Sequence, residues 1–296
     1  MAIHSGSTGV TLRWSIDQVP FGRIERERVV DDDELFYFLV GASFIEITSD
    51  LYTHSLIEYF DGDPVVTGWL RQEWEPQELQ HGTALRRYVA AVWPEFDWPR
   101  AYDHFRRSYG PLCSSELFGP TRGLELAARC VVETGTATFY TMIRDLTDEP
   151  VLRQLANLIR TDEVAHYGHF LQSFKRYRDE EGLGRMQILR ALLGRVTEID
   201  DEDAWIAFRS VYTMTRPGED AVRAYQQYRL KARERMRALY PYDLASTMLL
   251  RPLGLNRRLI RMIVPVLSAA ARQLFLLEAL RSRPRHLHPP ASIHYS

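Results

Sequence analysis

Cysteine is scarce in this sequence, and neither sign of charge dominates it. The two cysteines, Cys113 and Cys130, form no CxxC pair, which excludes a disulfide framework and a thiolate-rich zinc site and suits a reducing compartment. The formal net charge is −2, so the chain lacks the positive excess that is typical of nucleic-acid-binding proteins. We therefore expect no nucleic-acid partner.

Long uninterrupted apolar runs and a recognisable leader are also missing. Residues 1–14 lack the basic start and apolar block of a signal peptide. The most apolar late stretch, which begins at Leu259, is interrupted by Arg261, Pro265 and Arg272, so it is a poor membrane span. These absences predict a cytoplasmic protein without a membrane span. Its 296 residues suffice for one large domain with a substantial core.

No alternating strand pattern is present, and the chain reads as helix almost throughout. Asp63 followed by Pro64 is typical of an N-cap and a first helical position, and Thr147 or Asp148 before a proline repeats this pattern. Pro76 lies inside a predicted helix, where we expect a kink. The expected helices cover residues 32–60, 63–93, 98–108, 121–146, 150–178, 186–195, 201–238 and 257–282.

Four of these helices are long and are joined by short polar connections, which is typical of a helix bundle. The predicted fold is therefore all-α, with a four-helix bundle over about residues 32–178. A helical C-terminal extension follows over about residues 186–282. We expect residues 1–296 to form a single domain.

A glutamate and a histidine recur three residues apart on two of the long helices. Glu78 and His81 lie on the second, and Glu163 and His166 on the fourth. Residues at this spacing share one face of a helix. The first and third long helices each carry a glutamate in an apolar setting, at similar intervals of 32 and 30 residues before the paired glutamates. These two residues are Glu46 and Glu133.

Such a set of residues needs a cation if it lies in a bundle core. Unpaired carboxylates are costly to bury and repel one another, and two metal ions would remove that cost. Carboxylates and imidazoles without thiolates favour iron or manganese. Asp162 is a candidate partner for the second nitrogen of a metal-bound histidine. Thr136, one turn beyond Glu133, is expected to direct its hydroxyl toward the metals.

Three stretches resemble the soluble acyl-carrier-protein desaturases of the ferritin-like superfamily. "WLRQEWEPQELQHGTALRRY" is similar to that family's EExRHGxxLxxY block, "DEVAH" to its DEKRH block, and "ETGT" to its glutamate and threonine. The resemblance covers about residues 32–178. It implies a ferritin-like bundle that binds two iron ions, with manganese as a possible substitute, and it places Asp162 beside a histidine and Thr136 near oxygen. The implied metal ligands are Glu46, Glu78, His81, Glu133, Glu163 and His166.

The chain departs from the family's pattern at positions that flank the expected ligands. Gln77 and Gln80 replace a glutamate and an arginine of the first block, and Val164 and Ala165 replace lysine and arginine of the second. The metal ligands survive these changes. The substrate does not follow from them, because these neighbours shape the surface and the pocket.

The leading functional expectation is O2-dependent desaturation of a fatty acyl chain. The resemblance implies an acyl carrier protein as partner, a ferredoxin-like electron donor and a homodimer. The basic runs at residues 229–237 and 256–261 could contact an acidic carrier. A di-iron oxygenase that hydroxylates or N-oxygenates a small molecule is the first alternative, and ferritin-like iron oxidation or storage is the second. A radical-forming reductase subunit is disfavoured, because Leu85 and not tyrosine lies one turn past His81.

Overall fold

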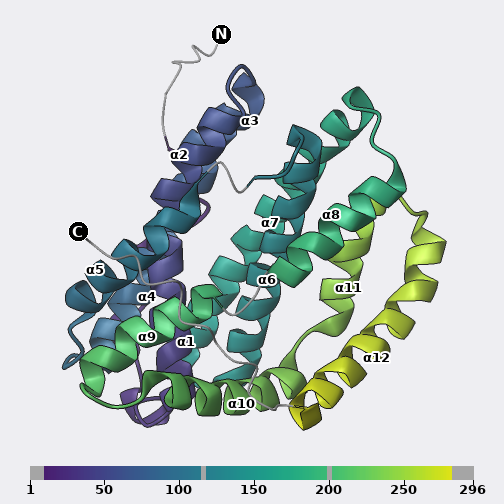
Figure 1. Ribbon diagram of the computed structural model, residues 1–296. Coiled ribbons are helices and arrows are strands. Elements are labelled where there is room, and N and C mark those ends of the chain that lie inside the picture. The colour runs from purple at the N-terminus through teal and green to yellow at the C-terminus, as the bar shows by residue number, and fades with distance from the viewer. Residues whose placement is uncertain (1–9, 115–117, 199–201, 282–296) are drawn as a thin grey trace, which may run out of the picture.

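The computed structural model describes residues 10–114, 118–198 and 202–281 (Figure 1). Within these ranges the chain is all-helical and contains no strand, which confirms the predicted class. The end of the expected extension, at residue 282, lies outside the described residues. The α-helices are α1 (Asp33–Ile47), α2 (Ser49–Tyr59), α3 (Pro64–Trp69), α4 (Glu75–Val92), α5 (Trp98–Tyr109), α6 (Arg122–Leu146), α7 (Pro150–Glu180), α8 (Arg185–Glu198), α9 (Glu202–Thr215), α10 (Ala221–Leu239), α11 (Tyr242–Leu250) and α12 (Arg257–Arg281).

Several helices begin where a side chain satisfies their free backbone amides. The Asp63 carboxylate accepts hydrogen bonds from the amides of Val65 and Val66, with Pro64 in the first turn, which confirms the predicted start of α3. Asp32 caps α1 and Thr121 caps α6 in the same way. Such caps contribute about 1 kcal/mol each.

The predicted cap of α7 is wrong by one or two residues. Glu149, and not Thr147 or Asp148, caps the helix, because its carboxylate accepts from the amides of Val151 at 3.1 Å and Leu152 at 2.7 Å. The Thr147 hydroxyl instead accepts from the amide of Glu149. The longer glutamate therefore reaches back over the first turn, which the sequence pattern did not distinguish.

Two of the expected helices are divided. The first breaks at Thr48, whose amide is shared between the Phe44 and Ile45 carbonyls and whose hydroxyl donates to the Phe44 carbonyl at 2.8 Å. The expected helix over residues 201–238 is two helices, α9 and α10, separated at Pro217 and Gly218; Gly218 has a φ of +85°, which ends helical geometry. Helix α11 was not predicted at all.

Pro76 lies just after a π-helical turn, Leu70–Trp74, which connects α3 to α4. Proline has no amide hydrogen and displaces the carbonyl four residues before it, here that of Gln72. That carbonyl accepts a hydrogen bond from the Thr11 amide at 2.8 Å. The irregularity expected at Pro76 is therefore a π-helical turn with a carbonyl that binds the N-terminal segment, residues 11–14.

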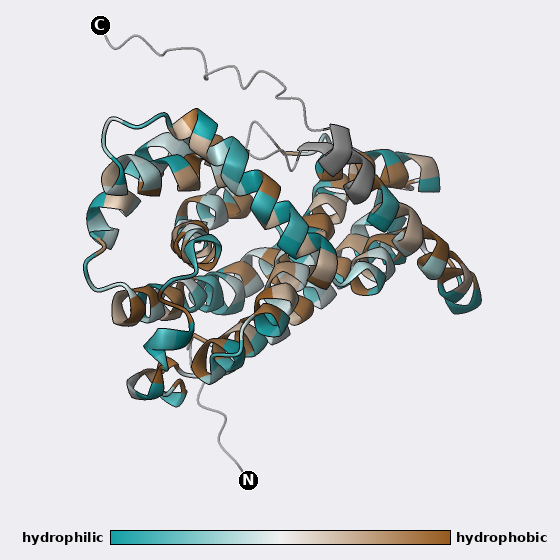
Figure 2. Cartoon of the chain, turned by 90° about the horizontal axis from the view of Figure 1, so that it is seen from below, coloured by the Kyte–Doolittle hydropathy of each residue, from teal (hydrophilic) through white to brown (hydrophobic). Residues whose placement is uncertain are grey.

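The helices that carry the predicted metal ligands pack in two pairs, α1 against α4 and α6 against α7. Helices α8 and α11 lie on α6, α9 lies on α1 and α5, and α12 stands at the edge against α10 and α11 (Figure 1). Hydrophobic and hydrophilic residues alternate along most helices (Figure 2), as amphipathic packing requires. Along α6 and α7, buried polar residues separate the members of two apolar clusters.

One helical stretch of the described residues, Asp33–Tyr59, is long and apolar enough to cross a membrane by length and composition. Of its most apolar window, 56% is buried inside the chain, and Glu46 faces the interior with 4% of its surface exposed. The core helix of a folded domain is buried in this way.

Candidate metal centre

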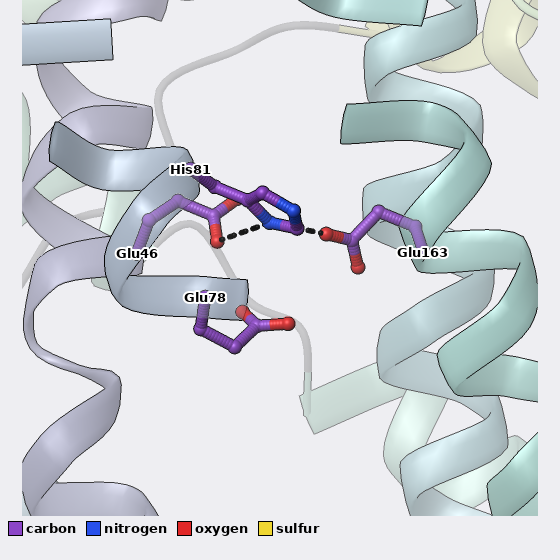
Figure 3. A group of neighbouring side chains, drawn as sticks. All are labelled: Glu46, Glu78, His81 and Glu163. Atoms are coloured by element: carbon purple, nitrogen blue, oxygen red, sulfur yellow. Dashed lines mark ion pairs between the residues drawn. The ribbon is translucent and has the colours of Figure 1, made fainter. Parts of the chain in front are cut away.

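The six residues predicted to bind metal meet in the interior, one or two from each of α1, α4, α6 and α7. None of them is more than 7% exposed. They form two groups of four that could each hold a metal ion, and both groups contain Glu78 and Glu163. We call the group with Glu46 and His81 the His81 half-site (Figure 3), and the group with Glu133 and His166 the His166 half-site.

In both half-sites the imidazole Nδ1 lies against carboxylate oxygens. His81 Nδ1 is 3.1 Å from Glu163 Oε1 and 3.6 Å from Glu46 Oε2. His166 Nδ1 is 2.9 Å from Glu78 Oε1 and 3.8 Å from Glu163 Oε2. The two rings are 5.9 Å apart, centroid to centroid. The half-sites are therefore adjacent.

Each of the six residues leaves one buried polar atom without a hydrogen bond in the described part of the chain. Such atoms are costly to bury. A cation among them would remove that cost, and carboxylate oxygens with imidazole nitrogens are suitable donors for it. The atoms are Glu46 Oε2, Glu78 Oε1, His81 Nδ1, Glu133 Oε2, Glu163 Oε1 and His166 Nδ1.

Asp162 holds the outer nitrogen of His81, as predicted for one of the two histidines. Its Oδ2 lies 3.0 Å from His81 Nε2 and also accepts from the indole N–H of Trp14 at 2.7 Å. A carboxylate is an acceptor, so His81 carries a hydrogen on Nε2, and when the ring is neutral it presents the Nδ1 lone pair to the half-site. Arg13 lies 3.7 Å from the other oxygen of Asp162.

Gln77 plays the corresponding part for His166. The Gln77 side-chain nitrogen donates to the Thr11 carbonyl at 2.8 Å, and its Oε1 lies 2.9 Å from His166 Nε2. Because the Thr11 carbonyl can only accept, the amide oxygen must face the histidine. His166 therefore also carries its hydrogen on Nε2 and presents Nδ1 to the half-site.

Three further side chains orient the carboxylates. The indole of Trp74 donates to Glu133 Oε1 at 3.1 Å, and the Tyr140 hydroxyl donates to Glu46 Oε1. The Thr136 hydroxyl lies 2.8 Å from Glu163 Oε2, closer than to the Glu133 carbonyl of its own helix at 3.2 Å, so it reaches the half-sites as expected. Each bond occupies one oxygen of its carboxylate, and the other oxygen has no hydrogen bond.

His169 lies outside both half-sites. It stacks on Trp69 with the ring centroids 4.1 Å apart, and burial lowers its pKa.

The carboxylic acids are strongly perturbed by burial. Burial raises the pKa of Glu78 well above its usual range, and the charges of Glu163 and Glu46 raise it further. Burial also raises the pKa of Glu133 well above its usual range, and the charge of Glu163 acts in the same direction. Without a cation, these two groups therefore favour the protonated state.

The pKa values of Glu163 and His81 are shifted in the directions that an ion pair between them produces. Burial alone would raise the pKa of Glu163, but close contact with His166 and His81 lowers it. Burial alone would lower the pKa of His81, but Asp162 and Glu163 outweigh it and raise that pKa well above its usual range.

Gly82 allows α4 to approach α1 at this point. A Cβ at position 82 would lie 2.7 Å from the Ile47 amide nitrogen and 3.0 Å from the Glu46 Cβ. Only glycine fits such an approach, so Gly82 sets the distance between Glu46 and His81.

Sequence reasoning anticipated the contacts of Asp162 and Thr136 but missed the other outer contacts, although some signals were visible. A glycine directly after a candidate ligand, Gly82, is a recognisable sign of close helix packing. Gln77 was noted only as a departure from a family pattern. Trp14 and Thr11 gave no local signal, because their partners are 148 and 66 residues away.

Two surface hollows lie away from these residues. One is lined by Arg144 and Arg153, the other by His54 and Arg71, and neither includes a half-site residue.

The basic run over residues 229–237 also serves the fold. Arg235 pairs with Asp32 at 2.6 Å and so anchors α10 to the start of α1.

Both cysteines are free and buried, in line with the absence of a disulfide framework.

The buried glutamates and histidines could hold a metal ion. No protein-family model and no curated protein sequence matches this chain.

Proposed function

We propose that this chain is a ferritin-like four-helix bundle with two iron ions and that it catalyses O2-dependent oxidation of an organic substrate. The observation that carries the proposal is the set of six buried atoms that have no hydrogen bond and lie in two half-sites that share Glu78 and Glu163. Shared carboxylates suit two adjacent cations. Manganese could replace iron in the same donor set.

Bound iron would supply the activation of dioxygen and the oxidising power. The protein's own contribution is to hold the donor atoms and to move protons. Trp74 and Tyr140 fix the terminal carboxylates Glu133 and Glu46 through their outer oxygens. The Thr136 hydroxyl, which is hydrogen-bonded to Glu163, is the group best placed to transfer a proton to the metal centre.

We place the substrate on the side of Thr136. Val132, Gly135, Thr136 and Phe139 form a half-buried stripe along α6, whereas their neighbour Glu133 is fully buried. A Cβ added at Gly135 would meet nothing within 4 Å. This stripe is therefore the more open approach to Glu163, while residues 11–14 occupy the side of the histidines.

For the substrate we propose a fatty acyl chain that is desaturated while attached to an acyl carrier protein. The support is the resemblance of the two glutamate–histidine blocks to desaturase motifs and the apolar character of Val132 and Phe139 on the open stripe. A cytoplasmic location, a ferredoxin-like electron donor and a homodimer belong to the same proposal. The departures from the desaturase pattern at Gln77 and Gln80 would instead favour hydroxylation or N-oxygenation of a small molecule.

The test is to incubate the iron-loaded, reduced protein with dioxygen and a panel of acyl carrier substrates, followed by mass spectrometry. Loss of two hydrogens from an acyl chain supports desaturation, and gain of one oxygen supports oxygenation. Glu133→Gln should abolish either product, and Glu95→Gln, an exposed position, should not. Continued uptake of iron into a mineral, with no product, would contradict the proposal in favour of storage.

A further inference from the structure

The two half-sites have matching inner donors but different outer partners. Each contains one histidine, one terminal glutamate and the shared pair Glu78 and Glu163. Behind His81 stands the carboxylate of Asp162, and behind His166 stands the neutral amide of Gln77. The outer partners therefore differ in charge, although Arg13 lies 3.7 Å from the other oxygen of Asp162.

The N-terminal segment, residues 11–14, keeps this difference in place. The Trp14 indole donates to the same oxygen of Asp162 that faces His81, and the ring lies parallel to the imidazole. The Thr11 carbonyl holds the Gln77 side-chain nitrogen, and the Thr11 amide binds the Gln72 carbonyl that Pro76 leaves free. A glutamate at position 77 would set a carboxylate against the Thr11 carbonyl, so the segment requires an amide there.

A carboxylate behind a metal-bound imidazole makes the ring a stronger donor than a neutral acceptor does, and such outer partners change metal affinity by about 10–100-fold. We propose that the His81 half-site binds the first metal ion and the His166 half-site the second, and that Asp162 and Gln77 are the positioning residues that set this order. The inference rests on the proposed two-metal centre and deepens it.

Two adjacent cations repel each other, so unequal binding steps in the intact protein would not by themselves reveal unequal half-sites. Single-ion binding to variants that retain one half-site avoids this problem. Mn²⁺ titration of the full-length, metal-free protein, followed by the electron paramagnetic resonance signal of free Mn²⁺, measures it directly. His166→Ala leaves the His81 half-site, and His81→Ala leaves the His166 half-site.

We expect His166→Ala to bind one Mn²⁺ about 10–100-fold more tightly than His81→Ala. Adding Asp162→Asn to His166→Ala should remove this advantage, because an amide then stands behind His81 in this variant, as Gln77 stands behind His166 in His81→Ala. Asp179→Asn, exposed and on the same helix, is the control for loss of one negative charge and should leave the affinity unchanged. Circular dichroism of each variant checks that the fold persists.

Equal affinities of the two single-histidine variants, or a tighter site in His81→Ala, would overturn the inference. If either variant fails to fold, Asp162→Asn in the otherwise intact chain decides: it should weaken the tighter of two binding steps and spare the weaker one, and the reverse would overturn the order. Binding of fewer than two ions by the unaltered protein would instead contradict the proposed two-metal centre, so the two failures are distinguishable.

Discussion

Gly82 lies so close to the backbone of Ile47 that a Cβ at position 82 would be 2.7 Å from the Ile47 amide nitrogen. In a helix interior, alanine is favoured over glycine by about 1 kcal/mol. Overpacking costs about 1–3 kcal/mol, and backbone atoms cannot yield as a flexible side chain can. The clash therefore outweighs the helix preference.

We predict that Gly82→Ala lowers the free energy of unfolding by about 1–2 kcal/mol and weakens metal binding at the His81 half-site, because α1 carries Glu46 away from His81. Urea unfolding and Mn²⁺ titration measure the two effects. Gly168→Ala is the control, since a Cβ there meets nothing within 4 Å, and it should be neutral or stabilising. A Gly82→Ala protein as stable as the original would show that the helices can separate without cost.

A second prediction concerns pH. Glu78, Glu133 and His81 have raised pKa values in the folded, metal-free protein, so the folded state binds more protons than the unfolded state above the unfolded pKa values of about 4.3 and 6.5. Stability then falls as pH rises. The lowered pKa of Glu163 acts oppositely, but only in acid, below about pH 4.3.

The urea midpoint of the metal-free protein should therefore decrease between about pH 5.5 and pH 8.5. Metal ions replace the protons, so the metal-loaded protein should lose this trend, and metal affinity should rise with pH. Glu133→Gln should make the metal-free profile shallower, while Glu78 and His81 keep part of the slope. A metal-free protein whose stability increases over this range would contradict the assigned protonation states.

Pro76 offers a third prediction. An alanine there would restore an amide hydrogen that competes with Thr11 for the Gln72 carbonyl. Release of Thr11 would free the Gln77 amide and loosen His166, so Pro76→Ala should weaken the second binding step more than the first. Global stability should change little. Equal effects on both steps in the Mn²⁺ titration would contradict an action of the proline through Thr11 and Gln77 alone.

The side chains of the half-sites could be predicted from sequence, as could the supporting residues Asp162 and Thr136, but the remaining supports could not. Glu46, Glu78, Glu133 and Glu163 stood out because acidic residues recurred at helical spacing and matched intervals within apolar helices. Gln77 depends on a backbone carbonyl 66 residues away, which no local pattern encodes.

Helix ends were predictable wherever a short side chain and a proline coincided, as at Asp63. The break at Thr48 was not, because threonine also lies inside helices and makes the same hydroxyl bond to the carbonyl four residues back there, as Thr138 does in α6.

A fourth prediction tests the proposed approach of the substrate. Gly135→Leu would fill the open space beside Thr136, so product formation should fall at least about tenfold while iron content stays unchanged. Gly168→Leu, which also faces open space but lies on the exposed side of α7, is the matched control. Unchanged turnover of Gly135→Leu would move the substrate to another side of the centre.

The central claim is that the six buried side chains hold two metal ions. The most direct measurement is elemental analysis of protein loaded with ferrous iron without oxygen and then freed of unbound metal, compared with Glu133→Ala treated in the same way. We predict two irons per chain in the unaltered protein and a lower content in Glu133→Ala, whose His166 half-site has lost a ligand. A single equivalent of metal in both proteins would contradict the account.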